Sequence, residues 1–255
     1  MLVKHVGAPL PHESARGHVT GQARYVDDQW MRAGKPVHLW PVCVPHAHAR
    51  VTALDTTRAA AAPGVSCVLT AEHVPGVNDV GPVRHDEPLF PSEVCFHGQP
   101  VAWVVAETEE QARQAAELVQ VDCEPLPAIL SIGDAIAAQS FSFGPERLAR
   151  GDARRALAAC PERLEGEIFV GGQEHFYLET QAALAWVDEA NLMMVHSSTQ
   201  HPAETQEVVA RVLGVGRHDV VVQCTRMGGA FGGKETQANA WAALAALAAR
   251  KLGRP

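Results

Sequence analysis

Several features that would point to particular protein classes are absent from this sequence of 255 residues. It has no run of Lys and Arg, and its formal net charge is −8, so it lacks the electrostatic footprint of a protein that binds nucleic acid or anionic lipid. The most apolar stretch, 240–249, is too short to span a bilayer, and the first residues do not form a signal peptide. We therefore expect no nucleic-acid partner, no membrane association and a cytoplasmic location.

Motifs for several kinds of chemistry are also missing. The six cysteines include no C-x-x-C pair, and a chain of this length does not need disulfide bonds, so we interpret them as reduced thiols and expect no iron–sulfur cluster on this chain alone. No pair of histidines has the helical spacing of a metal site. No Gly-x-Ser-x-Gly elbow occurs, which leaves a serine hydrolase without support.

The apolar content, 47% of the residues, is enough for a substantial core. Between residues 35 and 125, the pattern predicts two strand–helix–strand units, each closing on itself, in a small α/β domain. The second unit has the clearer signals, with an apolar run at 101–105 and a helix-capping box that starts at Thr108. Residues 127–150 have weak periodicity and are predicted to be a linker.

The remainder of the chain has a mixed helix and strand pattern. From residue 151 it predicts a strand at 164–170, a hairpin of strands at 182–187 and 192–197, a helix from Pro202 that ends at Gly214, a strand at 219–224 and a helix at 235–252. We therefore predict an α+β or α/β fold with a first domain at 1–126, the linker at 127–150 and a second domain at 151–255.

The first motif of possible chemical importance is residues 171–180, GGQEHFYLET. The adjacent Gly171 and Gly172 allow a sharp turn or a close approach to a ligand. The amide of Gln173 can donate a hydrogen bond to an oxo or carbonyl oxygen. The alternative is a tight turn with a partly buried polar cluster, which the composition alone favours.

The second motif is residues 227–235, MGGAFGGKE, in a predicted strand-to-helix turn. Backbone N–H groups in such a turn can bind an anion or an oxo group, and Phe231 between glycine pairs is suited to form a wall for a flat ligand. The alternative is an ordinary turn with Phe231 buried in the core. Glu235 either complements the helix dipole in the first turn or lines a pocket beside Phe231 and recognises a polar heterocycle.

The same motif nearly matches a phosphate-binding P-loop, because Gly228 and Gly233-Lys234 have the required spacing. The match fails at Glu235, which stands where Ser or Thr would ligate magnesium. A carboxylate at that position would repel the phosphates. The sequence therefore disfavours a nucleoside triphosphatase.

Together these motifs resemble the molybdenum-hydroxylase family, most closely its xanthine dehydrogenase branch. The resemblance also covers residues 12–15, 18–28 and 96–102, and all the motifs occur in the family's order along the chain. It implies an α/β hammerhead domain followed by the beginning of a molybdenum-cofactor-binding domain, with cofactor loops at 171–180 and 227–236.

The resemblance also implies roles for single residues. Gln173 would donate a hydrogen bond to the oxo ligand of molybdenum, without contacting the metal directly. Gly172, Phe231 and Gly232 would contact the molybdenum cofactor, which is molybdenum held by molybdopterin. Glu235 matches the glutamate that binds the purine in xanthine dehydrogenases, and aldehyde-oxidising and carbon-monoxide-oxidising relatives usually lack it.

The implied reaction is the oxidation of hypoxanthine and xanthine to urate with oxygen from water. Electrons would pass through 2Fe-2S clusters and FAD on a partner subunit to NAD. In the family, the general-base glutamate and a substrate-binding arginine lie in a C-terminal part outside the match, so we assign no catalytic base here. We expect a truncated or split gene product, or a fragment, that is inactive alone.

The expected partners are the purine, the C-terminal remainder of the molybdenum domain and the iron–sulfur and FAD subunit, in an oligomer. Two alternatives stay open at this point. One is a non-catalytic leftover or assembly fragment, and the other is a related hydroxylase for an aldehyde or another N-heterocycle.

Overall fold

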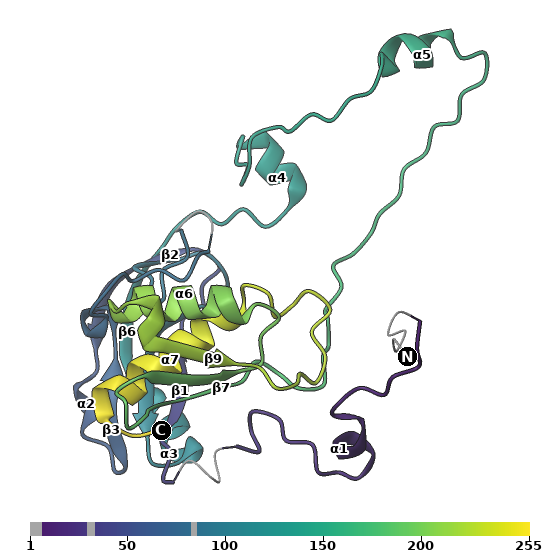
Figure 1. Ribbon diagram of the computed structural model, residues 1–255. Coiled ribbons are helices and arrows are strands. Elements are labelled where there is room, and N and C mark those ends of the chain that lie inside the picture. Colours follow the sequence, from purple (N-terminus) through teal and green to yellow (C-terminus); the bar gives the residue numbers. More distant parts are fainter. Residues whose placement is uncertain (1–6, 30–33, 83–85) are drawn as a thin grey trace. The chain divides into compact units, whose positions relative to one another are not determined.

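The structure is a computed structural model that describes residues 7–29, 34–82 and 86–255 (Figure 1). The chain divides into two compact units, one made of Met1–Leu126 with His175–Pro255 and the other of Pro127–Glu174. No helix in the described ranges is both long enough and apolar enough to cross a membrane.

The described residues of the larger unit that precede residue 127 form two small sheets. One has the strand order β1-β5-β3 and the other the order β4-β2-β6, and all their pairings are antiparallel. The strands are β1 (His38–Cys43), β2 (Ala49–Asp55), β3 (Val65–Leu69), β4 (Glu93–Val94), β5 (Pro100–Ala106) and β6 (Gln120–Pro125). The helices among the described residues are α1 (Ala15–Val19), α2 (Thr57–Ala60), the 3-10 helix η2 (Ala71–His73) and α3 (Glu109–Ala116).

The order of these elements agrees with the predicted strand–helix–strand units, but the prediction that each unit closes on itself is wrong. β2 and β3 flank α2 and lie in different sheets, as do β5 and β6, which flank α3. Each helix therefore carries the chain from one sheet to the other. Local periodicity predicts strands and helices, whereas the pairing partner of a strand depends on contacts far away in the sequence.

Strand β5 is apolar along its length because both of its faces are buried. Trp103 and Val105 belong to one hydrophobic cluster, and Ala102 and Val104 belong to another. Successive side chains of a strand point to opposite faces, so this alternation places β5 between two cores. The helix that follows is capped as predicted, since the Thr108 hydroxyl accepts the N–H of Gln111 at 3.2 Å.

The part of the larger unit that follows residue 174 has one sheet of order β7-β8-β9, in which β8 pairs antiparallel with β7 and parallel with β9. The predicted hairpin, the helix from Pro202 and the last strand are confirmed, and Gly214 ends that helix in the left-handed conformation. The elements are β7 (Ala183–Val187), β8 (Met193–Ser197), α6 (Pro202–Leu213), the 3-10 helix η3 (Arg217–Asp219), β9 (Val220–Gln223) and α7 (Ala238–Leu252).

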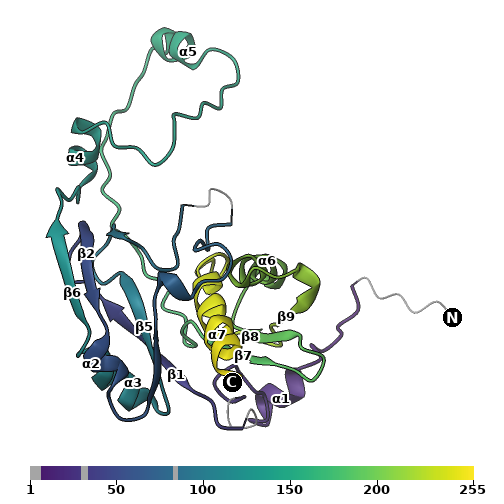
Figure 2. The same cartoon turned by 90° about the vertical axis from the view of Figure 1, so that its left-hand side faces the viewer.

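One hydrophobic cluster joins the two parts of the larger unit. Leu69 of β3 and Trp103 of β5 belong to the same cluster as Val209 of α6 and Leu247 of α7. The rings of Trp103 and Trp241 meet edge to face with their centroids 5.3 Å apart. Figure 2 shows α7 between the β1-β5-β3 sheet and the β7-β8-β9 sheet. The last helix therefore has packing partners on both sides.

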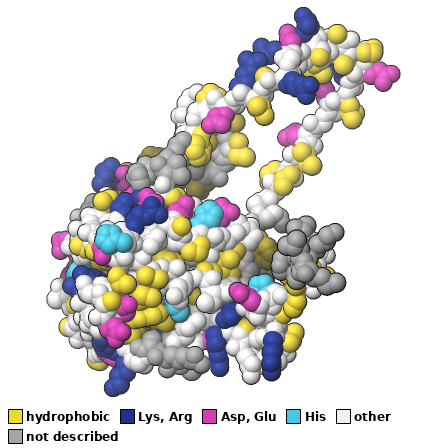
Figure 3. Space-filling view, in the orientation of Figure 1, with side chains coloured by type: hydrophobic (Ala, Val, Ile, Leu, Met, Phe, Trp, Pro, Cys, Tyr) yellow, Lys and Arg dark blue, Asp and Glu magenta, His cyan; other side chains and the backbone are white. Residues whose placement is uncertain are grey.

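The second unit, Pro127–Glu174, contains only the short helices α4 (Ile132–Ala137) and α5 (Ala153–Ala159). Neither helix buries a residue, and Figure 3 shows hydrophobic side chains at the surface along this segment. The predicted strand at 164–170 is wrong, because these residues are exposed coil without a neighbouring strand to pair with. The predicted domain boundaries stay a prediction.

The shared cluster predicts a large effect of shortening Leu69. Replacement of this buried side chain in Leu69→Ala should lower the free energy of unfolding by about 2–5 kcal/mol, because it removes apolar contacts and leaves a cavity. Urea unfolding followed by circular dichroism measures the change. The matched control Leu148→Ala alters an exposed leucine of the second unit and should change the value by less than about 0.5 kcal/mol. Equal effects of the two changes would contradict the packing described here.

Candidate functional site

The first glycine-containing motif is divided between the two units of the chain, and the second lies wholly in the larger unit. Gly172 and Gln173 belong to the Pro127–Glu174 unit, where both are exposed and the Gln173 amide donates to the Gly172 carbonyl at 3.3 Å. The rest of the first motif, from His175, belongs to the larger unit together with the whole second motif. The structure brings residues 175–180 and 227–235 into contact. The cofactor roles of Gly172 and Gln173 stay predictions.

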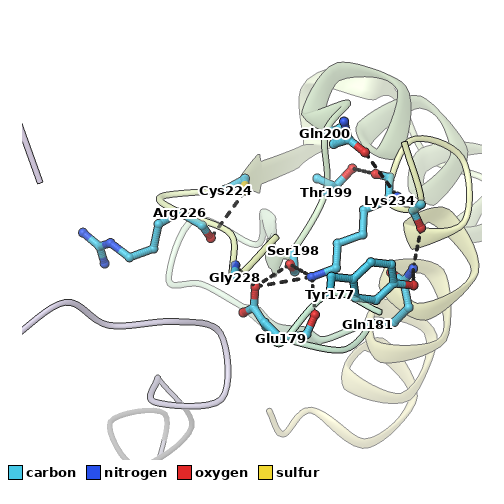
Figure 4. Close-up of polar contacts among 11 residues, drawn as sticks. Tyr177, Glu179, Gln181, Ser198, Thr199, Gln200, Cys224, Arg226, Gly228 and Lys234 are labelled. Carbon is cyan, nitrogen blue, oxygen red and sulfur yellow. Dashed lines mark hydrogen bonds and ion pairs between the residues drawn. The ribbon is translucent and has the colours of Figure 1, made fainter. Parts of the chain in front are cut away.

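A buried lysine lies at the centre of the contact between residues 175–181 and 228–235 (Figure 4). The Lys234 side chain is 0% exposed, and its Nζ donates to the Glu179 carbonyl and to the Ser198 hydroxyl, both at 2.7 Å. It also pairs with Glu179 Oε2 at 3.4 Å and lies 4.7 Å from the centre of the Tyr177 ring. A buried charge is tolerated when it is paired and hydrogen-bonded, and Lys234 meets both conditions.

The carboxylate of Glu179 links the same two loops. Its Oε2 accepts hydrogen bonds from the Ser198 hydroxyl and from the backbone N–H of Gly228, both at 2.7 Å. In return, the backbone N–H of Glu179 donates to the Gly228 carbonyl at 3.1 Å. Glu179 therefore fixes the beginning of the 228–235 loop, and Lys234 fixes its end.

Two glutamines hold the backbone between these points. Gln200 Oε1 accepts the backbone N–H groups of Gly232 and Lys234 at 3.2 and 3.3 Å. The backbone N–H of Gln200 donates to the Lys234 carbonyl at 2.8 Å. The Gln181 amide donates to the Gly233 carbonyl at 2.8 Å and to the Tyr177 hydroxyl at 3.0 Å. The path of residues 232–234 is therefore set by side chains outside the loop.

Two glycines of the loop are required by close packing. A Cβ atom added at Gly228 would lie 2.4 Å from Cβ of Glu179, and one added at Gly233 would lie 2.7 Å from the Tyr177 ring. Gly232 is favoured by its backbone conformation instead, because its φ is +86° and an added Cβ would meet nothing within 4 Å. The glycine pattern thus serves contact between the loops as well as backbone conformation.

Phe231 and Glu235 are both exposed, unlike the buried Lys234 between them. Phe231 is 75% exposed, so the interpretation of its ring as part of the core is wrong. Its φ is +53°, a conformation that disfavours residues with a side chain and that occurs mainly where surrounding contacts enforce it. Glu235 is exposed in the turn before α7, which begins at Ala238, so its interpretation as a residue of the first helical turn is also wrong.

The sequence reasoning missed the residues that support the loop. The motif pattern suggests only a P-loop role for Lys234, and it indicates no role for Glu179 or Ser198. One available signal was an acidic residue in one glycine-containing motif and a basic residue in the other, which can form a pair across two loops. A partner of Arg226 was not foreseeable, because the side chain donates to the Arg24 carbonyl and reaches the Ser14 hydroxyl at 3.5 Å, far away in the sequence.

Two family models together match nearly the whole chain. Residues 20–127 match the aldehyde oxidase and xanthine dehydrogenase a/b hammerhead domain, and residues 137–255 match the molybdopterin cofactor-binding domain. The chain therefore belongs to the aldehyde oxidase and xanthine dehydrogenase family, the molybdenum hydroxylases. The prediction of a hammerhead domain followed by part of a molybdenum-cofactor-binding domain is confirmed.

Individual relatives agree with this family. Xanthine dehydrogenase of Dictyostelium discoideum is 43% identical over 99% of this chain, and xanthine dehydrogenase/oxidase of Rattus norvegicus is 42% identical over 98%. Aldehyde oxidase 4 of Cavia porcellus is 40% identical over 98% of this chain. The chain spans 18% of the first and third of these relatives and 19% of the second.

Solved structures of similar fold agree with this family. The aldehyde oxidoreductase from Desulfovibrio gigas superposes with a TM-score of 0.85 at 29% identity, covering 96% of this chain and 29% of that one. Quinoline 2-oxidoreductase from Pseudomonas putida 86 has a TM-score of 0.80 at 27% identity, covering 96% of this chain and 33% of that one.

The packed loops predict that Gly228 does not tolerate a methyl group. Gly228→Ala should lower the free energy of unfolding by about 1–3 kcal/mol, because the added Cβ would overlap the side chain of Glu179. The matched control is Gly144→Ala, where an added Cβ meets nothing within 4 Å. Urea unfolding measures both variants. If Gly228→Ala is as stable as Gly144→Ala, the contact between Gly228 and Glu179 is not present.

Proposed function

We propose that this chain supplies the hammerhead domain and the first part of the cofactor-binding domain of a xanthine dehydrogenase. The complete enzyme would oxidise hypoxanthine to xanthine and xanthine to urate. Each step converts a ring C–H bond into a C–O bond with oxygen from water, and releases two electrons and two protons. In the overall step, NAD takes up both electrons and one proton as NADH, by way of 2Fe-2S clusters and FAD on a partner subunit.

The observation that carries this proposal is that Phe231 and Glu235, four residues apart, are both exposed on a loop whose backbone is fixed by buried contacts. A carboxylate can accept hydrogen bonds from the ring N–H groups of a purine, and an aromatic ring offers a flat wall to a flat ligand. Binding groups that are held before the ligand arrives lose little freedom on binding. The relatives named xanthine dehydrogenase support the purine as substrate.

We further propose that residues of this chain contact the molybdenum cofactor. Phe231 and Gly232 leave an exposed ring and an open backbone position that a planar pterin group can approach. Gln173 would donate its amide hydrogen bond to an oxo ligand, and Gly172 would allow close approach. When bound, the cofactor would supply the oxygen transfer and accept the two electrons. Phe231 would exclude water from one side, and Glu235 would orient the purine.

The purine assignment predicts a selective effect of Glu235→Ala. In the complete enzyme this change should lower kcat/KM for xanthine by about 10²-fold or more while altering aldehyde oxidation much less, because only the purine presents ring N–H donors to the carboxylate. Steady-state kinetics with both substrates measures the difference. Glu189→Ala, at an exposed turn residue of the β7–β8 hairpin, is the control and should change neither rate. Equal losses for xanthine and aldehyde would reject the purine role and favour the aldehyde oxidase alternative.

The complete enzyme would require further protein beyond this chain. Close to the site, Phe176 is 90% exposed and Leu178 is 97% exposed, and such apolar surface commonly marks an interface. We propose that the remainder of the molybdenum domain covers these side chains and contributes the catalytic base, while an iron–sulfur and FAD subunit takes the electrons. The assembly would be an oligomer in the cytoplasm.

Co-expression tests this dependence. The chain alone should contain far less than one molybdenum per polypeptide and should not oxidise xanthine, because part of the cofactor site would lie on the absent protein. Co-expression with the C-terminal remainder of a relative's molybdenum domain should raise the metal content, measured by mass spectrometry of the purified complex. A full complement of molybdenum and activity in the chain alone would contradict the proposal. Stable folding without any gain of molybdenum on co-expression would favour a non-catalytic fragment.

A further inference from the structure

We propose that Lys234 is a positioning residue whose buried ammonium group fixes the 228–235 loop, so that Phe231 and Glu235 keep their exposed positions. The need to hold Phe231 and Glu235 in place rests on the proposed function. The claim that Lys234 fixes the loop can be tested on this chain alone. Lys234 directly precedes Glu235 and is three residues from Phe231, so a shift of its backbone moves both groups. Its side chain is buried in the interior of the larger unit, against Glu179 and Ser198.

The hydrogen bonds of Lys234 exclude the more familiar role of a loop lysine, which is to bind an anionic ligand. An ammonium group has three N–H donors. Three acceptors surround Nζ: the Glu179 carbonyl and the Ser198 hydroxyl at 2.7 Å, and Glu179 Oε2 at 3.4 Å. The donors are therefore committed to the protein, and the side chain has no exposed surface through which a phosphate could reach it.

The charge of Lys234 also determines whether Glu179 can stay in place. Glu179 Oε1 is buried and has no hydrogen-bond partner among the described residues, so the carboxylate depends on the contacts of Oε2. Removing one partner of a buried ion pair leaves the other charge without compensation, which is more costly than the pair's net contribution. Loss of the ammonium group should therefore release Glu179, and with it the N–H of Gly228 at the other end of the loop.

Amide hydrogen exchange of the 255-residue chain, measured by mass spectrometry, tests the inference without any cofactor. In Lys234→Met, which keeps an unbranched side chain and removes the charge, peptides covering 228–235 should exchange at least about tenfold faster than in the parent chain. Lys251→Met, at an exposed lysine in the last turn of α7, should leave them unchanged.

A second control separates positioning from a general loss of stability. Val209→Ala removes part of a buried side chain in α6 and should destabilise the whole unit without contacting the loop. Urea is added to the parent, Lys234→Met and Val209→Ala until they have equal stability. Faster exchange of 228–235 in Lys234→Met alone supports the inference, whereas equal exchange in both variants overturns it.

If Lys234→Met does not fold, Glu179→Gln replaces it. The amide oxygen can still accept the N–H of Gly228, but the negative charge is lost, so exchange across 228–235 should again increase selectively. An unchanged loop in Glu179→Gln overturns the inference.

A rigid loop in these variants together with a purine-selective effect of Glu235→Ala would reject the positioning role only. A mobile loop together with no effect of Glu235→Ala would reject the purine site only.

Discussion

A single buried ammonium group organises the candidate site. Lys234 Nζ is held by Glu179 and Ser198, and the same carboxylate accepts the N–H of Gly228, so one ion pair connects both ends of a glycine-rich loop. Glycine-rich loops have many accessible conformations, and fixing one of them costs conformational entropy. The network supplies contacts that offset this cost and leaves Phe231 in an unfavourable backbone conformation at the surface. Such an arrangement is expected where a loop must meet a ligand in a defined geometry.

The network in turn depends on the packing of the larger unit. Residues 175–181 precede β7, Ser198 follows β8, and the 228–235 loop connects β9 to α7, so the site lies where the ends of all three strands of one sheet meet. That sheet and α7 share a hydrophobic cluster with the β1-β5-β3 sheet. The hammerhead domain therefore contributes to the stability of the cofactor-binding segment even though its strands contain none of the site residues.

Local signals in the sequence were enough to predict most elements and both motifs. The capping residue Thr108, the turn between β7 and β8 and the helix stop at Gly214 each depend on neighbouring residues, and these predictions are confirmed. Strand pairing, the exposure of Phe231 and the partners of Lys234 depend on residues distant in the sequence, and periodicity does not reveal them. The strand predicted at 164–170 failed for the same reason, because an apolar segment becomes a strand only beside another strand.

An experimental structure of the complete enzyme with a bound purine would test the central claim most directly. The account predicts that Lys234 Nζ is buried against Glu179 and Ser198, and that the Phe231 ring and the Glu235 carboxylate both face the purine. A structure in which the Lys234 side chain lies in solvent or binds the ligand, or in which the purine is bound far from Glu235, would contradict it.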